Sequence, residues 1–469
     1  MVNDGSGGKS DANRGSDGSD TGNDGRAVRR RSLLKTSGAG VVGTALAGCI
    51  SFNGGDDSGD GGDGEGGDSN ETGGNETDSD GGSGGDFPDT ISVGVLAPEP
   101  SDNPIGASIA NGAQLAVDEL NADGGIGGAD VEISVKDTKE DPATGRSRYQ
   151  ELTVNEGVDV TTGVFTSEVL LNIMDDIAQQ QTLHMTAGAA TPEASARVAE
   201  NYEQYKYHFR TGPTNARHLG QNMVDFVEAK SGDLGWESVA VLVEDYAWTE
   251  PVSAVLDEKL GDTGVEVAMS QRYASGTENF GPVYDEVENS GADAAFIAMA
   301  HTGTPAVVQW ASQQRPFEFG GIHVPMQLPS YYEATDGAVN YGVTQNSATP
   351  QSEVTDKTVP FAENYNEEFG SYPVYTGYIA YDAVHQFASV AEEVGSVASD
   401  DLVSGLEESS YTGTAGTIEY YGPDDQFAHD VVYEEGKVWP IFMQWQDGNQ
   451  EVIYPDDLAT ADYQTPPWV

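Results

Sequence analysis

The feature that most constrains the fold is a regular alternation of short apolar runs with helix-like segments, which begins at Ile91. Residues 91–96 form a short apolar run, residues 105–120 carry Ala, Leu and Val at helical spacing, and residues 131–135 form a second apolar run. Strands that alternate with helices long enough to cross over a sheet are typical of a mostly parallel sheet. The sequence therefore predicts an α/β fold.

The alternation continues through two consecutive stretches of similar layout. In the first stretch we expect helix 144–155, strand 158–164, helix 169–180 and strand 183–186. After Pro213 we expect helix 217–230, strand 238–243, helix 251–260, strand 265–270, helix 280–288, strand 294–300, helix 305–313 and strand 322–325. A chain of 469 residues also exceeds what one hydrophobic core usually supports. We therefore predict two similar Rossmann-like lobes in tandem.

The last part of the chain, with two helices and a few short strand-like pieces, is not expected to form a third domain. It predicts helices 359–369 and 378–394, followed by strand-like pieces at 416–421, 431–433 and 441–445. We expect this part to weave back across both lobes.

The start of the chain has the features of a cleaved export signal. Arg30 and Arg31 precede a short apolar run that ends in Gly48 and Cys49, and this run is too short to span a bilayer. The arginine pair resembles a twin-arginine export motif, and the end of the run resembles a lipobox. We therefore expect residues 1–48 to be removed and Cys49, the single cysteine of the chain, to be lipidated, which would anchor the protein in the membrane.

Residues 49–88 consist mostly of Gly, Asp, Glu, Ser, Asn and Thr. With so little to bury, this segment is expected to be a disordered, self-repelling tether. It contains two N-glycosylation sequons, at Asn70 and Asn75. Such triplets also arise by chance in Asn- and Thr-rich linkers, so glycosylation is left open.

The charge and the motifs of the chain exclude several functions. There are 78 acidic and 21 Lys or Arg residues, for a net charge of −57. At molar salt the Debye length falls to about 3 Å, so we interpret this acidity as an adaptation to high salt; it also argues against binding nucleic acid. Metal, cofactor and catalytic motifs are missing from the sequence, and the Gly-rich residues 124–128 lie between a helix and a strand, the reverse of a phosphate loop. We expect neither an enzyme nor a bound cofactor or metal.

From about Ile91 to Gln446 the chain resembles a known family. The matching stretches, in order, are 91–96 with its loop to Gly106, 116–128, Asp137 with Asp141-Pro142, 189–193, 209–211, 244–248 and 378–384. Their order and spacing resemble type I periplasmic binding proteins of the leucine/isoleucine/valine-binding branch, in a haloarchaeal-like form. The resemblance implies two lobes joined by a three-strand hinge, with lobe 1 at 89–211 plus 340–414 and lobe 2 at 212–339 plus 415–469. The hinge crossings would then lie near Gly212, Val339 and Thr414.

On the first lobe, the resemblance implies that Ser167, Ala189 and Thr191 hold the carboxylate and ammonium of an amino acid. Each follows a strand, where an open parallel sheet leaves a crevice. A Ser or Thr in that place is also an ordinary helix N-cap, and that alternative remains open.

On the second lobe, the resemblance implies that the ligand is contacted by Trp248 or Tyr246, by His301 or Thr302, and by Gln327. Gln327 departs from the family, because an acid there would pair with an ammonium group and an amide does not. Glu244, Asp245 or Glu333 could supply that charge. Alternatively, the ligand is an amide, a urea-like compound or an organic acid. Packing of the loop also accounts for Tyr246, and His301 has a structural alternative as well.

The resemblance implies an extracellular solute-binding lipoprotein of an ABC importer. We expect a monomer anchored on the outer face of the cell membrane, which captures an amino acid of the branched-chain type and delivers it to permease and ATPase subunits. A ligand-sensing receptor is the alternative, but no output domain follows the lobes in this sequence.

Overall fold

The computed structural model describes residues 87–469. Within them, the first sheet is parallel and has the strand order β2-β1-β3-β4-β5. Its strands are β1 (Thr90–Ala97), β2 (Asp130–Asp137), β3 (Val160–Gly163), β4 (Leu183–Ala187) and β5 (His208–Gly212). Its connecting helices are α1 (Pro104–Ala122), α2 (Pro142–Gln150) with a π-helical turn (Glu151–Glu156), α3 (Ser167–Gln180), α4 (Glu193–Glu200) and α5 (Tyr202–Tyr205). The predicted export signal with Arg30 and Arg31, the lipidation site Cys49 and the sequons at Asn70 and Asn75 all lie outside the described residues.

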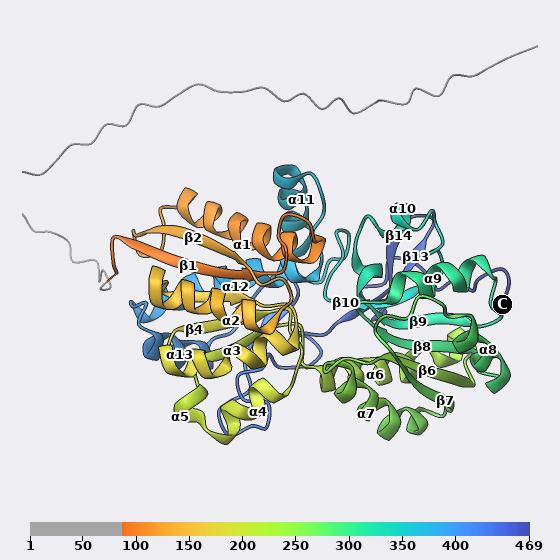
Figure 1. The fold of residues 1–469 in the computed structure, drawn as a ribbon. Helices are drawn as coiled ribbons and strands as arrows, with labels where there is room; N and C mark the ends of the chain where they lie inside the picture. The colour runs from red at the N-terminus through yellow and green to blue at the C-terminus, as the bar shows by residue number, and fades with distance from the viewer. Residues whose placement is uncertain (1–86) are drawn as a thin grey trace, which may run out of the picture. The chain divides into compact units, whose positions relative to one another are not determined.

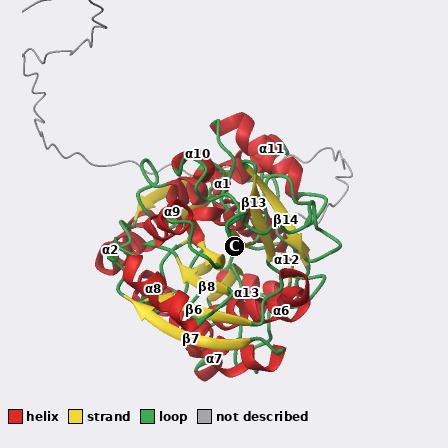
Figure 2. Ribbon diagram, turned by 90° about the vertical axis from the view of Figure 1, so that its right-hand side faces the viewer, coloured by secondary structure: helices red, strands yellow, loops and turns green. Residues whose placement is uncertain are grey.

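The second lobe repeats this plan with a parallel sheet of order β7-β6-β8-β9. Its strands are β6 (Ser238–Glu244), β7 (Glu266–Tyr273), β8 (Ala294–Met299) and β9 (Glu318–His323). The helices are α6 (Ala216–Leu234), α7 (Thr249–Lys259), α8 (Gly281–Ser290), α9 (Gly303–Ser312) and α10 (Tyr331–Ala334), with 3₁₀ turns at Leu260–Thr263 and Val324–Gln327. Beside β9 runs an antiparallel sheet of β10 (Val343–Asn346), β13 (Ile441–Gln446) and β14 (Asn449–Tyr454). Figure 2 shows helices around the strands β6, β7 and β8 of the second lobe. The predicted two-lobe α/β fold is therefore confirmed.

The central strands form because their side chains are apolar on both faces. In β6 every residue from Val239 to Val243 is fully buried, which is the pattern of a strand covered by helices on both sides. Helix ends are marked by local chemistry: Asn215 caps α6 by accepting from the backbone N–H groups of Arg217 and His218, and Gly235 ends that helix in a left-handed conformation. These signals explain why the predicted elements lie close to the observed ones.

The C-terminal part returns to both lobes, as Figure 1 shows. Helix α12 (Tyr375–Val394) packs along α1, so that residues far apart in sequence share the first hydrophobic core. The other elements of this part are α11 (Thr358–Phe369), α13 (Ser399–Glu408) and the short hairpin of β11 (Tyr411–Thr412) and β12 (Thr417–Ile418). The close approach of α1 and α12 requires a glycine, because a Cβ at Gly112 would lie 2.3 Å from the carbonyl oxygen of Gly377.

Two of the three hinge crossings differ from the expected places. Val339 belongs to the core of the second lobe, and the chain stays there through β10, because that strand pairs with β13. Beyond Thr414, the side chains of Tyr420, Val431 and Val438 are still part of the first core. The chain therefore crosses after Asn346 and again between Val438 and β13. No helix within residues 87–469 is long and apolar enough to cross a membrane.

Candidate functional site

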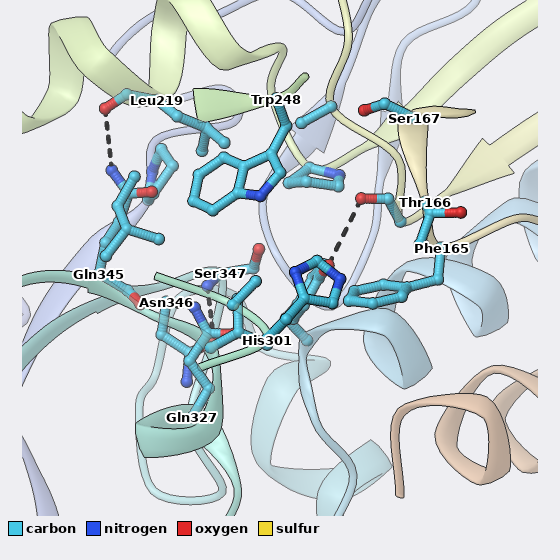
Figure 3. A pocket seen from close by; sticks show the side chains of 18 of the residues that line it. Phe165, Thr166, Ser167, Leu219, Trp248, His301, Gln327, Gln345, Asn346 and Ser347 are labelled. Carbon is cyan, nitrogen blue, oxygen red and sulfur yellow. Dashed lines mark hydrogen bonds between the residues drawn. The ribbon is translucent and has the colours of Figure 1, made fainter. Parts of the chain in front are cut away.

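A cavity lies where the carboxyl ends of both parallel sheets meet, with a volume of about 60 Å³ (Figure 3). A cavity of this kind suits a small ligand. Its wall is apolar over much of its area, with rings and aliphatic groups from Phe165, Pro213, Leu219, Trp248, Ile322, Val324, Tyr375 and Pro440. None of the residues that line it is Lys or Arg.

Part of the polar wall consists of side-chain atoms without hydrogen-bond partners. Five buried polar atoms of lining residues have no hydrogen-bond partner in the described part of the chain, and they are Thr166 Oγ1, Ser167 Oγ, Trp248 Nε1, His301 Nε2 and Gln327 Oε1. A buried polar atom left unpaired costs about 1–3 kcal/mol, so native proteins rarely keep several together without a reason. Two of the five come from the first lobe and three from the second, so the cavity offers hydrogen bonds from both sides.

On the first lobe the wall is the N-terminus of α3. Thr166 is its N-cap residue, but its hydroxyl makes no capping hydrogen bond, and Ser167 is the first helical residue. The N–H groups of a first helical turn have no partner within the helix and carry a partial positive charge. Two free hydroxyls beside them form a place where a carboxylate can bind without a buried cation.

The approach to this helix is conformationally restricted. Gly163 has φ +103°, and a Cβ there would lie 2.2 Å from the carbonyl oxygen of Leu96, so only glycine fits. Val164 follows with φ 67°, which is unusual for a β-branched residue. Hydrogen bonds hold it there, since its N–H donates to Leu96 O at 2.8 Å and its carbonyl accepts from the N–H of Ala189 at 2.9 Å. The backbone is thus bent so that α3 points its first turn at the cavity.

On the second lobe, Trp248 and Gln327 present one donor and one acceptor. Trp248 directly precedes α7, in a loop that Arg272 holds by donating to Asp245 and to the carbonyl of Tyr246. Gln327 is almost completely buried, and its amide nitrogen donates to Gln345 O at 2.8 Å. That bond orients the side chain, so the unpaired atom is the carbonyl oxygen Oε1.

His301 is the third residue of the second lobe with an unpaired polar atom at the cavity. Its Nδ1 lies 2.9 Å from a carboxylate oxygen of Glu244, whose side chain is fully buried at the end of β6. Burial opposes ionisation of Glu244, but hydrogen bonds from the side chain and backbone of His301 and from the backbone of Ala300 favour it, and the pKa of this carboxyl lies below its usual value. The ring of Tyr246 stacks on the imidazole with 3.9 Å between the ring centroids, and the tilted ring of Phe165 from the first lobe has its centroid 6.2 Å away.

Ala189 and Thr191 do not line the cavity, although Gly188 and Ala190 do. The N–H of Ala189 is already bound to Val164, and the hydroxyl of Thr191 accepts from the N–H of Glu193 at 3.3 Å, which is a local cap. The carbonyls of both residues accept from the guanidinium of Arg210. Their observed part is therefore to fix the loop, not to face the ligand.

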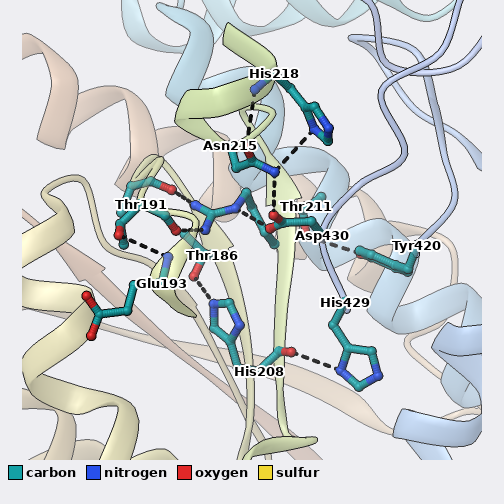
Figure 4. A network of polar contacts seen from close by, with 12 residues as sticks. Thr186, Thr191, Glu193, His208, Thr211, Asn215, His218, Tyr420, His429 and Asp430 are labelled. Carbon is teal, nitrogen blue, oxygen red and sulfur yellow. Dashed lines mark hydrogen bonds and ion pairs between the residues drawn. The ribbon is translucent and has the colours of Figure 1, made fainter. Parts of the chain in front are cut away.

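Arg210 belongs to a buried network that also reaches the second lobe (Figure 4). Its side chain and that of Asp430 are both fully buried and form an ion pair. The other carboxylate oxygen of Asp430 accepts from Asn215 Nδ2 at 2.8 Å, and Asn215 caps α6. In addition, the N–H of Ala216 donates to Ala190 O at 2.7 Å. The loop that lines the cavity is thus tied to the first helix of the second lobe.

The structure brings four of the predicted residues together around one cavity: Ser167, Trp248, His301 and Gln327. Tyr246 contacts the cavity only through His301. Sequence reasoning missed Thr166, although its place directly after a strand and before a helix was a usable signal. It also missed Gln345, Asn346 and Ser347, which line the cavity at the end of a strand too polar to be recognised. Among the described residues, no group of three or more His, Cys, Asp or Glu side chains is placed to hold a metal ion.

Comparison with known proteins agrees with this architecture. The Leu/Ile/Val-binding protein homolog 8 of Brucella melitensis is 24% identical over 374 residues, which cover 76% of this chain and 88% of that protein. A branched-chain amino acid transporter substrate binding protein of Streptococcus pneumoniae, solved with isoleucine, superimposes with a TM-score of 0.65 at 20% identity, covering 78% of this chain and all of the other. A solute binding protein of Rhodopseudomonas palustris, solved with 3,4-dihydroxy benzoic acid, gives a TM-score of 0.65 at 20% identity, covering 81% and 99% of the two chains.

The sequence profile of the Periplasmic binding protein family matches residues 90–435. This stretch spans both parallel sheets and the part of the chain that returns to the first lobe. The chain therefore belongs to the Periplasmic binding protein family.

Proposed function

We propose that this protein is the lipid-anchored, extracellular ligand-capturing subunit of an ABC importer, and that its ligand is a small carboxylic acid, in the first place an amino acid of the branched-chain type. The single observation that carries this proposal is the set of five unpaired buried polar atoms around one largely apolar cavity. They match a molecule with an anionic end and a compact apolar body.

The proposed mechanism begins on the first lobe. The ligand's carboxylate accepts hydrogen bonds from the first turn of α3 and from the hydroxyls of Thr166 and Ser167. Trp248, His301 and Gln327 then complete the site from the second lobe. A ligand shifts the balance between open and closed forms only if it contacts both lobes, and the cavity provides polar atoms on both. The closed form is the one delivered to the permease.

A second ligand class has specific support. The rings of Phe165, Trp248 and Tyr375 line the cavity, and a solute binding protein of the same fold was solved with 3,4-dihydroxy benzoic acid. Flat rings stack well between aromatic side chains. An aromatic organic acid is therefore the alternative to a branched-chain amino acid, and both classes share the carboxylate that α3 would bind.

Calorimetric titration of the full chain at molar salt tests the proposal. The ligands are leucine, isoleucine, valine, 4-hydroxybenzoate and the amide leucinamide, which lacks the carboxylate. We expect one of the acids to bind and leucinamide to bind at least about 10-fold more weakly. Leucinamide has no carboxylate that could accept charge-assisted hydrogen bonds from the first turn of α3. If none of the four acids binds, the ligand assignment is wrong.

The site itself is tested by the double substitution Thr166→Val and Ser167→Ala. Losing two hydrogen bonds to a charged group should raise the dissociation constant of the bound acid by about 10- to 100-fold. The matched control is Ser195→Ala, because Ser195 is also fully buried in the first lobe with an unpaired hydroxyl but does not line the cavity. Equal affinity of the double variant and the control would place the site elsewhere.

The membrane anchor is tested separately. Cys49→Ser should move the protein from the membrane fraction to the soluble fraction, and mass spectrometry should show acyl chains on Cys49 of the wild-type chain only. Retention of the Cys49→Ser protein on membranes would contradict lipidation at this residue.

A further inference from the structure

The carboxylate of Glu244 makes hydrogen bonds to four groups in the short segment 300–302, which contains His301. It accepts from the backbone N–H of Ala300 at 2.9 Å and of His301 at 3.0 Å, from the hydroxyl of Thr302 at 3.1 Å, and it lies 2.9 Å from His301 Nδ1. All of these partners belong to the segment that brings His301 to the cavity. The carboxylate therefore fixes both the backbone and the imidazole of this segment.

The contact with Glu244 determines which imidazole nitrogen carries the hydrogen. An ionised carboxylate can only accept hydrogen bonds, so His301 Nδ1 must be the donor. In a neutral imidazole the other nitrogen is then an acceptor. That other nitrogen, Nε2, is buried, has no partner among the described residues and belongs to a residue that lines the cavity.

The orientation of the ring is equally restricted. Tyr246 stacks on it with an interplanar angle of 13°, and the ring of Phe165 from the first lobe is tilted against it by 51°. Gln327 adds a second acceptor on the same side, because its amide nitrogen is committed to Gln345 O and its Oε1 is unpaired. His301 and Gln327 thus present two acceptors, beside the unpaired donor Trp248 Nε1 of the same lobe, and contacts with neighbouring residues hold both acceptor side chains in place.

We propose that Glu244 is a positioning residue that acts through His301: it holds the imidazole hydrogen on Nδ1, so that Nε2 selects ligands with a hydrogen-bond donor at the second-lobe end of the cavity. The inference rests on the proposed function, because it assigns the second end of the same ligand. It names the ligand class as a carboxylic acid that also carries an N–H or O–H group, and it disfavours acids whose second group only accepts. Gln327, which is neutral, contributes the other acceptor, and the acidic residue that lines the cavity, Glu168, belongs to the first turn of α3 on the first lobe.

The first test measures the hydrogen position directly. ¹⁵N NMR of the imidazole distinguishes a protonated from an unprotonated Nε2, and His301→Asn assigns the signal among the seven histidines. We expect an unprotonated Nε2 in the wild-type chain. In Glu244→Gln, the new amide N–H₂ can donate to Nδ1, so Nε2 should become protonated. A protonated Nε2 in the wild-type chain would overturn the inference, whether or not any ligand binds.

The second test measures selectivity with leucine and its keto acid, 4-methyl-2-oxopentanoate. These molecules share the carboxylate and the apolar body, but only leucine carries a donor. We expect wild-type protein to prefer leucine by about 10- to 100-fold and Glu244→Gln to reduce that ratio at least about 10-fold, chiefly through better binding of the keto acid.

The matched control is Glu318→Gln. Glu318 is another buried glutamate of the second lobe, and its carboxylate accepts from Trp236 Nε1 without lining the cavity. If Glu244 had only a structural role, Glu244→Gln would lower the affinities for leucine and for the keto acid equally and leave their ratio unchanged. This is the result that we expect if Glu318→Gln affects binding at all. An unchanged ratio in Glu244→Gln would therefore refute the role of Glu244, whereas failure of wild-type protein to bind any acid would instead refute the proposed function.

Discussion

The buried ion pair between Arg210 and Asp430 should be the most sensitive polar contact in the protein. Both side chains are fully buried, Arg210 also donates to the carbonyls of Ala189 and Thr191, and Asp430 also accepts from Asn215. Asp430→Ala leaves the guanidinium charge without a counter-ion in the interior. Breaking a buried pair in this way costs about 3–5 kcal/mol, so we expect the free energy of unfolding to fall by that amount.

Urea unfolding at fixed molar salt measures this loss, because urea is uncharged and does not itself screen the pair. The control is Asp456→Ala, which removes the partner of Lys230 from a pair whose acidic side chain is 83% exposed. An exposed pair contributes at most about 1 kcal/mol. If Asp430→Ala lowered the free energy of unfolding no more than Asp456→Ala, the buried ion pair would contribute no more to stability than an exposed one.

A second variant separates charge from position. Arg210→Met combined with Asp430→Leu removes both charges, and such replacements are often neutral or even stabilising. It should therefore recover most of the stability lost in Asp430→Ala. The loop of Ala189 and Thr191 would still lose its donors, so ligand affinity should remain reduced by about 10-fold or more. Full recovery of both stability and affinity would mean that Arg210 does not position the loop.

Three further predictions concern stability. Burial lowers the pKa of His184 to about 3 and that of His323 to about 4, so below pH 6.5 the folded state binds protons less readily than the unfolded state. Each histidine should therefore lower the free energy of unfolding by about 2–3 kcal/mol between pH 8 and pH 4.5. The urea midpoint should fall over the same range. Asp382, whose pKa burial raises to about 6, opposes this by about 2 kcal/mol in the same range, so Asp382→Asn should steepen the fall. Gly112→Ala should destabilise by about 1–3 kcal/mol or more in the same assay, because of the 2.3 Å approach to Gly377, whereas Gly232→Ala, which meets nothing within 4 Å in helix α6, should stabilise by about 0.5–1 kcal/mol. The urea midpoint should also rise with KCl concentration, since salt screens a net charge of −57, and a flat response would argue against adaptation to high salt.

The strands that sequence predicted best are those buried on both faces. β6 and β8 read as continuous apolar runs, and the predicted and observed bounds agree within a residue. β5 and β10 were missed because their residues are polar. The strand His208–Gly212 contains Arg210, whose burial depends on Asp430, a residue more than two hundred positions away. No local pattern contains that information.

The same limit applies to the site. The loops after the strands could be predicted, because open parallel sheets place ligands at the carboxyl ends of their strands. Which atoms remain free in those loops could not be predicted, since the N–H of Ala189 is taken by Val164 and the hydroxyl of Thr191 by Glu193. The third hinge crossing was expected near Thr414 for a related reason: the chain beyond it looks irregular, but Tyr420, Val431 and Val438 are apolar enough to stay in the first core.

The acidic composition of the chain and the absence of Lys and Arg from the cavity lining both suit a protein that works in molar salt. If the protein works in molar salt, charge pairs at the surface contribute little, because screening acts within about 3 Å. Hydrogen bonds inside a cavity are screened much less. In the proposed site the ligand would be held by hydroxyls, an indole, an imidazole and an amide, while no Lys or Arg lines the cavity. Arg210, which is fully buried, holds a loop and does not face the cavity. A site built in this way keeps its affinity where a site based on exposed cations would lose it.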